Sequence, residues 1–94
     1  MAGLFERIRA AVIAERYIIG VHAAERLDER EIPDWQVVEG IATGLTICER
    51  PADWPNPIVE VEQLLPDGTR VKAVWAWVAY HQVAKLVTVH YFDE

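Results

Sequence analysis

The chain has 94 residues and a net charge of −6, and 52% of its residues are hydrophobic. This composition excludes a disordered tail, which would hold few apolar residues, and it fits a single domain over residues 1–94. The acidic balance argues against nonspecific binding of nucleic acid but leaves room for a small local basic pocket.

Membrane and targeting segments are not expected. The longest apolar stretch, residues 73–80, is far shorter than the roughly 20 residues that a membrane-spanning helix needs. Charged residues between Glu6 and Arg16 interrupt any signal-peptide core. Cys48 is the only cysteine, which excludes an internal disulfide and a cysteine-based zinc site. We therefore expect a cytoplasmic protein that makes no membrane contact.

The N-terminal part of the chain shows helical patterns. Apolar residues recur at helical spacing over residues 3–15, which predicts a first amphipathic helix. Residues 17–19 form a short apolar link. Gly20 is a suitable N-cap for a second helix over residues 21–31, which ends because the residue before Pro33 is disfavoured in helical conformation.

A third helix is expected to follow. Asp34 is a good N-cap residue, and Gly44 occupies a position that is typical of a C-cap glycine. The apolar residues at helical spacing predict an inner face made of Trp35, Val38, Ile41 and Ala42.

The rest of the chain predicts strands. Residues 51–57 hold three prolines and form a loop, since proline cannot join the ladder of a central strand. Pro66-Asp67-Gly68 has the composition of a hairpin turn. The expected strands cover residues 45–48, 58–65, 70–79 and 83–92. The pattern predicts an α+β fold, with two to three N-terminal helices on an antiparallel sheet of three to four strands.

Three polar residues share one stripe of the second helix. His22, Arg26 and Arg30 are spaced four residues apart, so their side chains lie in line. A histidine beside two guanidinium groups can act as a general base next to phosphate-stabilising cations. In the alternative interpretation, His22 packs at the helix start and the arginines form a structural network with Glu15, Glu39 or the C-terminus.

Several short patterns occur in a characteristic order. Residues 22–32 read H-A-x-x-R-x-x-x-R-x-I, the loop contains Asp53-x-Pro55-x-Pro57, and the last strand contains Thr88-Val89-His90. In this order they resemble the DUF4258 family of small domains, over nearly the whole chain. The resemblance implies a fold similar to the barnase and RelE-like ribonucleases, in which N-terminal helices pack on a curved antiparallel sheet. It also implies a toxin encoded beside a small antitoxin.

The resemblance implies roles for individual residues. His22, Arg26 and Arg30 match the polar positions that family members share. Members commonly have a histidine where this chain has Lys72, and a tyrosine where it has His90. On this analogy Lys72 and the arginines would stabilise the phosphate, His22 would be the base and His90 the acid.

Two functions are therefore carried forward. The first is a metal-independent endoribonuclease of the toxin type, with RNA as its substrate, a cognate antitoxin as its partner and no cofactor. The second is a non-catalytic relative that binds a protein partner or self-associates through its tryptophan-rich sheet. The two differ in whether the arginines lie in an open site or are buried against carboxylates.

The remaining candidates have structural interpretations. We expect Trp75 and Trp77 to be core or interface anchors, and Trp54 to pack on the sheet as a lid. His81 is expected to be solvated in a turn, and Cys48 to be a small buried hydrophobe. His90 has a structural interpretation as well, as a histidine satisfied within the fold. The three histidines lack ligand spacing, so no metal site is expected.

Overall fold

The computed structural model describes residues 3–92, which fold into helices and a mixed sheet. The helices are α1 (Leu4–Ile13), α2 (Val21–Glu29), α3 (Asp34–Gly40) and the 3₁₀ helix η1 (Ile41–Thr43). The strands are β1 (Tyr17–Ile19), β2 (Leu45–Arg50), β3 (Ile58–Leu64), β4 (Arg70–Val78) and β5 (Val83–Tyr91). The predicted α+β class is confirmed.

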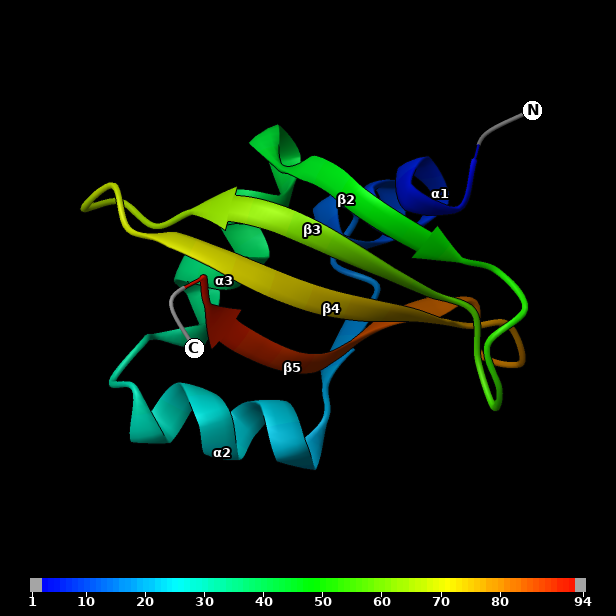
Figure 1. Ribbon diagram of the computed structural model, residues 1–94. Helices are drawn as coiled ribbons and strands as arrows, with labels where there is room; N and C mark the ends of the chain where they lie inside the picture. The colour runs from blue at the N-terminus through cyan, green and yellow to red at the C-terminus, as the bar shows by residue number, and fades with distance from the viewer. Residues whose placement is uncertain (1–2, 93–94) are drawn as a thin grey trace.

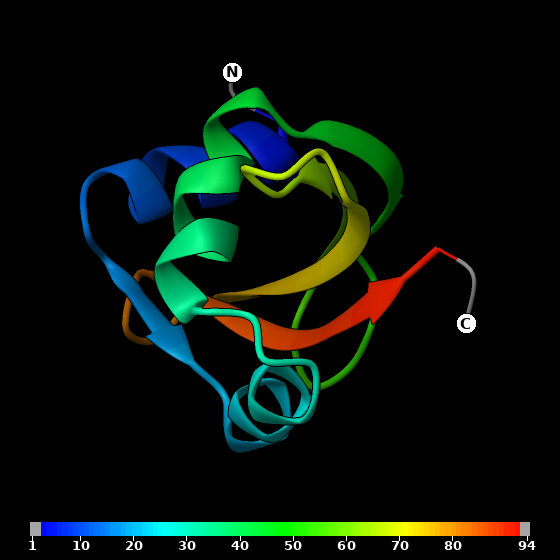
Figure 2. The same cartoon turned by 90° about the vertical axis from the view of Figure 1, so that its left-hand side faces the viewer.

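The sheet has the strand order β1-β5-β4-β3-β2 and curves around α1 and α3 (Figure 1). Figure 2 shows α2 on the far side of β5 from those two helices. The prediction of three to four antiparallel strands is wrong, because residues 17–19 form a fifth strand that pairs in parallel with β5. Three residues are too few to show strand alternation, and their partners lie more than 60 residues further along the chain.

Helix α1 buries one face against the sheet, with Phe5, Ile8 and Val12 in the core. Its N-cap, Gly3, supplies no side-chain hydrogen bond. Instead the Phe5 N–H donates to a carboxylate oxygen of Glu49 on β2, at 3.1 Å. A carboxylate at the start of a helix also interacts favourably with the helix dipole. The sheet therefore caps the helix that it packs against.

The third helical segment departs from the sequence expectation. Helix α3 begins after Pro33 rather than after Asp34, and η1 continues it to Thr43. Gly44 has an extended backbone with φ −69°, so it is not a left-handed C-cap. Glycine is needed there for space, because a Cβ at this position would lie 2.6 Å from Val61 Cγ1.

The predicted inner face of the third helix is only partly correct. Val37 and Ile41 are fully buried, whereas Trp35 is 51% exposed and Ala42 is also exposed. Figure 2 shows α3 inside the curve of the sheet, and Val37 and Ile41 lie on the side of this segment that faces the core, with Val38 half-buried against it. The neighbouring apolar line, which includes Trp35, faces outward.

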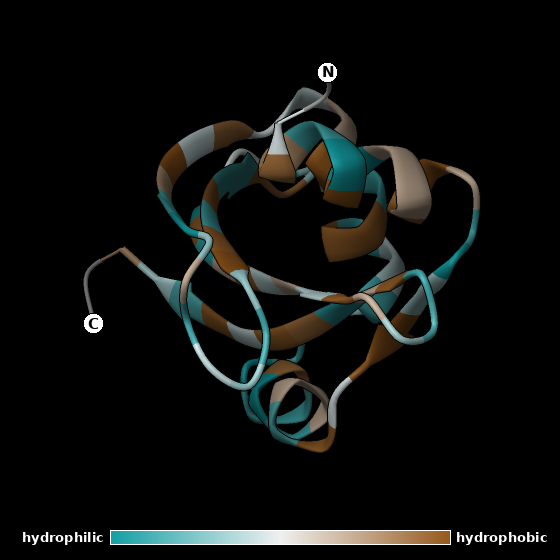
Figure 3. Ribbon diagram, turned by 90° about the vertical axis from the view of Figure 1, so that its right-hand side faces the viewer, coloured by the Kyte–Doolittle hydropathy of each residue, from teal (hydrophilic) through white to brown (hydrophobic). Residues whose placement is uncertain are grey.

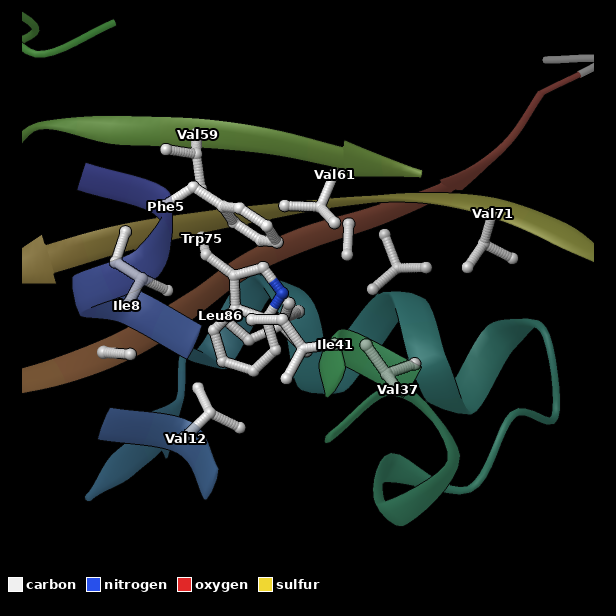
Figure 4. Close-up of a cluster of buried hydrophobic side chains, with 14 of the residues drawn as sticks. Phe5, Ile8, Val12, Val37, Ile41, Val59, Val61, Val71, Trp75 and Leu86 are labelled. Carbon is white, nitrogen blue, oxygen red and sulfur yellow. The ribbon is translucent and has the colours of Figure 1, made fainter. Parts of the chain in front are cut away.

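The core is centred on Trp75, which is fully buried between the sheet and the helices (Figure 4). Its indole Nε1 donates to Gln63 Oε1 at 3.0 Å, and Gln63 Nε2 donates to the Val37 carbonyl at 2.7 Å. Burying a polar amide costs free energy unless it is hydrogen-bonded, and here both ends of the Gln63 amide are. The two bonds link β3, β4 and α3.

Trp75 and Trp77 both belong to the core, as predicted. The sheet surface proposed for self-association therefore does not contain them. The expectation for Trp54 is wrong, because this side chain is 91% exposed at the tip of the loop between β2 and β3. Cys48 is half-buried rather than buried, and His81 is exposed in the turn before β5, as predicted.

Buried apolar residues alternate with half-buried glutamates along β3, whereas β4 is apolar and buried throughout residues 73–77. Figure 3 shows hydrophobic segments in the helices as well as in the strands. Within residues 3–92, every helix is too short or too polar to cross a membrane.

Candidate functional site

The candidate site lies on the outer face of the sheet, defined as the face of β2–β5 that is turned away from α1 and α3. Figure 1 looks onto this face. Alternation along β3 sends Val59 and Val61 into the core and leaves Glu60 and Glu62 on the outer face. The same alternation on β4 places Lys72 outward between buried neighbours.

Strand register brings two of the predicted site residues together. Lys72 is the cross-strand partner of Glu62 on one side and of His90 on the other. Partners in an antiparallel pair have Cα atoms about 5 Å apart, and their side chains point to the same face. His90 and Lys72 are therefore immediate neighbours, although 18 residues separate them in the sequence. His90 is half-buried there.

Glu60 is held between two cations. An Arg50 Nη1–H donates to one carboxylate oxygen of Glu60, and Lys72 Nζ lies 3.6 Å from the other. Arg50 Nε also donates to Asp53 at 3.1 Å. The hydrogen bonds to Glu60 and then to Asp53 raise the pKa of Arg50 above its ordinary value. The Glu60 side chain is only 16% exposed, so this carboxylate is fixed in place.

A second pair flanks the first on the same face. Arg70 binds Glu62 with both arms of its guanidinium, at 3.3 and 3.0 Å. The same guanidinium lies over the Phe92 ring, 4.6 Å from its centroid. Planar two-point binding of this kind orients both side chains. Glu62 is thus matched to a different cation from Glu60.

The outer face differs in charge from the rest of the chain. All the basic residues of β2–β5 lie on it, and they are Arg50, Arg70, Lys72 and Lys85. Within residues 3–92, their ion-pair partners include the carboxylates of Asp53, Glu60 and Glu62. The outer face therefore concentrates basic side chains on a chain whose total charge is −6. A local cationic field can attract an anion to an otherwise acidic protein.

Helix α2 runs beside β5 in the same direction. The Gly20 N–H at its start donates to the Leu86 carbonyl at 2.9 Å, and the Tyr91 hydroxyl donates weakly to the Arg30 carbonyl at its end, at 3.5 Å. The Arg30 guanidinium lies over the Tyr91 ring, 5.6 Å from its centroid. The stripe of polar residues on α2 therefore follows the edge of β5.

The two arginines on α2 are anchored differently from the prediction. Arg26 pairs with Glu29 of the same helix at 2.7 Å, and Arg30 lies 3.7 Å from the same carboxylate. Glu15 and Glu39, which were considered as partners, line a groove between α1 and α3. A contact with the C-terminus lies outside the described residues.

His22 does not join the other predicted residues. It is exposed in the first turn of α2, near Leu86, whereas Arg30 ends the helix near Tyr91. Eight residues of helix separate His22 from Arg30, about 12 Å at 1.5 Å per residue. The structure thus brings Lys72 and His90 together and places Arg30 beside the next residue of β5, while His22 lies at the opposite end of α2.

Comparison with known proteins gives one match. The model of the family described as a domain of unknown function, DUF4258, matches residues 19–91. This chain belongs to the DUF4258 family. The matched region contains α2 and the whole outer face. No curated protein and no solved structure matches the chain.

In this DUF4258 domain, sequence reasoning missed Glu60 and Arg50. A signal for Glu60 was present, because a hairpin centred on Asp67 pairs residue 62 with 72 and residue 60 with 74. Together with the alternation of the strand, this predicts that Glu60 and Lys72 share a face. Arg50 had no such signal, because β2 contains a bulge between Thr46 and Cys48 that changes which residues face outward.

The residue types of the DUF4258 outer face support acid–base chemistry. A carboxylate, an ammonium group and an imidazole lie on three adjacent strands, β3, β4 and β5. Among residues 3–92, no three His, Cys, Asp or Glu side chains are grouped so that they could hold a metal ion.

Proposed function

We propose that this protein is a metal-independent endoribonuclease and that the outer face of the sheet binds the reacting phosphodiester. One observation carries the proposal, namely that Glu60, Lys72 and His90 lie on one face in neighbouring strands. These are the residue types of a base, a phosphate-stabilising cation and an acid. The resemblance to the barnase and RelE-like group is a supporting analogy.

The reaction needs only groups that this face and the RNA supply. The Glu60 carboxylate removes the proton of the ribose 2′-hydroxyl, and the 2′ oxygen attacks the adjacent phosphorus. The P–O5′ bond breaks as the His90 imidazolium gives a proton to the leaving 5′ oxygen. Lys72 stabilises the negative charge that builds up on the phosphoryl oxygens. The products are a 2′,3′-cyclic phosphate and a 5′-hydroxyl end.

The spacing of the strands suits this assignment. Glu60 and His90 belong to the strands on either side of β4, so two strand spacings, about 10 Å, separate their backbones laterally. Both side chains extend from the outer face, and Lys72 lies between them. A phosphodiester above Lys72 would thus have the base on one side and the acid on the other.

Helix α2 has a separate role in the proposal. Arg26 is paired with a carboxylate that is itself 56% exposed, and an exposed ion pair of this kind is weak enough to exchange for a phosphate. We assign Arg26 to the RNA backbone beyond the cleaved bond, whereas Arg30, whose side chain is only 13% exposed and lies over Tyr91, is assigned a structural role. His22, at the far end of α2, is assigned to a neighbouring nucleotide rather than to the cleavage step.

The test is cleavage of single-stranded RNA by the purified protein at low salt with a chelator present. His90→Ala and Glu60→Gln are each expected to lower the rate by roughly 10²–10⁴-fold, as for loss of a general acid or base. Glu62→Gln is the matched control, because it neutralises the next outward carboxylate of the same strand. It should change the rate only a few-fold.

Thermal melts show whether each variant is folded, and analysis of the product ends reports the cyclic phosphate. If the wild-type protein leaves RNA intact under these conditions, the proposal fails. If His22→Ala abolishes cleavage while Glu60→Gln does not, the base is His22 and the assignment of Glu60 is wrong.

A further inference from the structure

A second surface lies on the side of the molecule opposite the outer face. Helices α1 and α3 and the start of β1 enclose an open groove with a volume of about 380 Å³. Its walls are largely apolar and are formed by Val12, Ile13, Tyr17, Trp35, Val38 and Ala42. We call it the α1–α3 groove.

The groove exposes large apolar side chains that the fold leaves uncovered. Ile13 is 62% exposed and Trp35 is 51% exposed, although each belongs to an otherwise amphipathic helix. Trp35, Val38 and Ala42 form a second apolar line on the third helical segment, beside the buried line of Val37 and Ile41. One helical segment therefore carries two apolar lines, and in the second line Val38 is half-buried against the core while Trp35 and Ala42 are exposed. Contiguous exposed apolar surface of this kind is typical of binding sites.

The charges at the groove are all of one sign. Glu15 and Glu39 are the charged residues among those that line it. Arg16, the basic residue next to Glu15, is turned to another contact, because its Nη1 donates to the Gln82 carbonyl at 2.8 Å. A molecule bound in the groove would therefore contact an apolar surface and the carboxylates of Glu15 and Glu39.

We propose that the α1–α3 groove is a docking site for a segment of a partner protein that presents one or two large apolar side chains flanked by Lys or Arg. The apolar side chains would cover Trp35 and Ile13, and the basic ones would pair with Glu15 and Glu39. A second copy of this chain fits less well, because two molecules of charge −6 repel each other. The groove and the outer face lie on opposite sides of the sheet, so this proposal stands independently of the ribonuclease activity.

The probe is a short synthetic peptide of leucine and lysine residues, titrated into the full chain by calorimetry at moderate salt. Two control peptides have the same length, one with glutamate in place of lysine and one with serine in place of leucine. We expect one-to-one binding of the leucine–lysine peptide, and affinities at least ten-fold weaker for both controls.

Variants place the binding in the groove. Trp35→Ala and the double variant Glu15→Gln/Glu39→Gln should each weaken binding at least ten-fold. Trp54→Ala removes a tryptophan that lies elsewhere and is more exposed than Trp35, and Glu25→Gln with Asp28→Gln removes two exposed carboxylates of α2. These control variants should bind the peptide with the affinity of the wild type. All variants should have the melting temperature of the wild type, because the altered side chains are exposed.

Three results would overturn the proposal. One is the absence of binding to the wild-type chain. Another is an equal loss of affinity in the groove variants and in the control variants, which would mean general attraction of a cation to an acidic protein. The third is a dimer in sedimentation experiments that Trp35→Ala dissolves, because the occupant would then be a second copy.

Discussion

The two faces of the sheet place polar groups in different ways, although the same strands form both. On the inner face, Gln63 is the one polar residue of the described core, and both ends of its amide are hydrogen-bonded. On the outer face, Glu60 and Lys72 are held by ion pairs that solvent still reaches. Stability should therefore depend on the inner face, and the outer face is free to carry chemistry.

The difference follows from the cost of burial. Gln63 lies in a closed core, where an unmet hydrogen bond costs free energy, so its neighbours must fit it closely. Exposed ion pairs contribute little to stability, so residues on the outer face can serve binding or catalysis without a large loss of folding free energy. Substitutions on the two faces should separate stability from activity.

The largest effect is expected at Trp75. Replacing this buried side chain by alanine should lower the free energy of unfolding by roughly 3–5 kcal/mol, as for large-to-small changes in a core. Trp75→Phe keeps most of the ring but removes the Nε1 donor to Gln63, so it should cost less than the alanine variant and still be measurable. Urea unfolding followed by circular dichroism gives both values. A Trp75→Phe variant as stable as the wild type would mean that the Gln63 link is unimportant.

A smaller loss is expected at Gly44, at the border of the inner face. A Cβ there would lie 2.6 Å from Val61 Cγ1, so Gly44→Ala should cost about 1–3 kcal/mol through overpacking. Gly3→Ala is the control, because nothing lies within 4 Å of the Cβ that it would add. Urea midpoints for the two variants should differ clearly, and equal midpoints would contradict the tight contact.

On the outer face, Lys72→Ala should barely change stability. Its partner Glu60 keeps the bond from Arg50, so the change in unfolding free energy should stay below about 1 kcal/mol. RNA cleavage, measured in parallel, should fall by at least ten-fold if Lys72 stabilises the phosphate. A large loss of stability would show that the ion pairs of the outer face hold the fold together.

The smallest effect is expected in the hairpin that joins β3 to β4. Asp67 accepts a hydrogen bond from the Thr69 N–H at 2.9 Å, and this bond lowers the pKa of Asp67 below its ordinary value of 3.8. Because the folded state favours the charged form, the stabilisation is present above the unfolded pKa and disappears as pH falls through the folded pKa. Thermal melts of the wild type and Asp67→Asn should therefore differ most near neutral pH, and the difference should shrink as the pH falls below 3.8. A constant difference down to strongly acidic pH would exclude this role for the charge.

Local patterns predicted much of the fold. The spacing of apolar residues located α1 and α2 to within about two residues, and alternation with the Pro66-Asp67-Gly68 turn gave the hairpin of β3 and β4. Short or irregular elements were missed. β1 has too few residues to show a period, and Trp54 lies in a loop whose path the prolines restrict but do not determine.

The candidate site was less predictable than the fold. Helical spacing placed His22, Arg26 and Arg30 on one stripe of α2, and this local relation depends only on helix geometry. The neighbours of Lys72 depend on strand register instead. His90 reaches it through the β4–β5 pairing and Glu60 through the β3–β4 pairing.

The sequence by itself determined the α+β class, the membership of the DUF4258 family and the alternation of β3 between the two faces of the sheet. These properties are set by periodicity and composition over short stretches, where each residue interacts mainly with its neighbours in the chain. Only the tertiary structure decided that Glu60, Lys72 and His90 meet on one face, that His22 stays apart, and that Trp35 lines an open groove. Those outcomes depend on register, sheet curvature and the packing of α3, which arise from contacts between segments far apart in the chain.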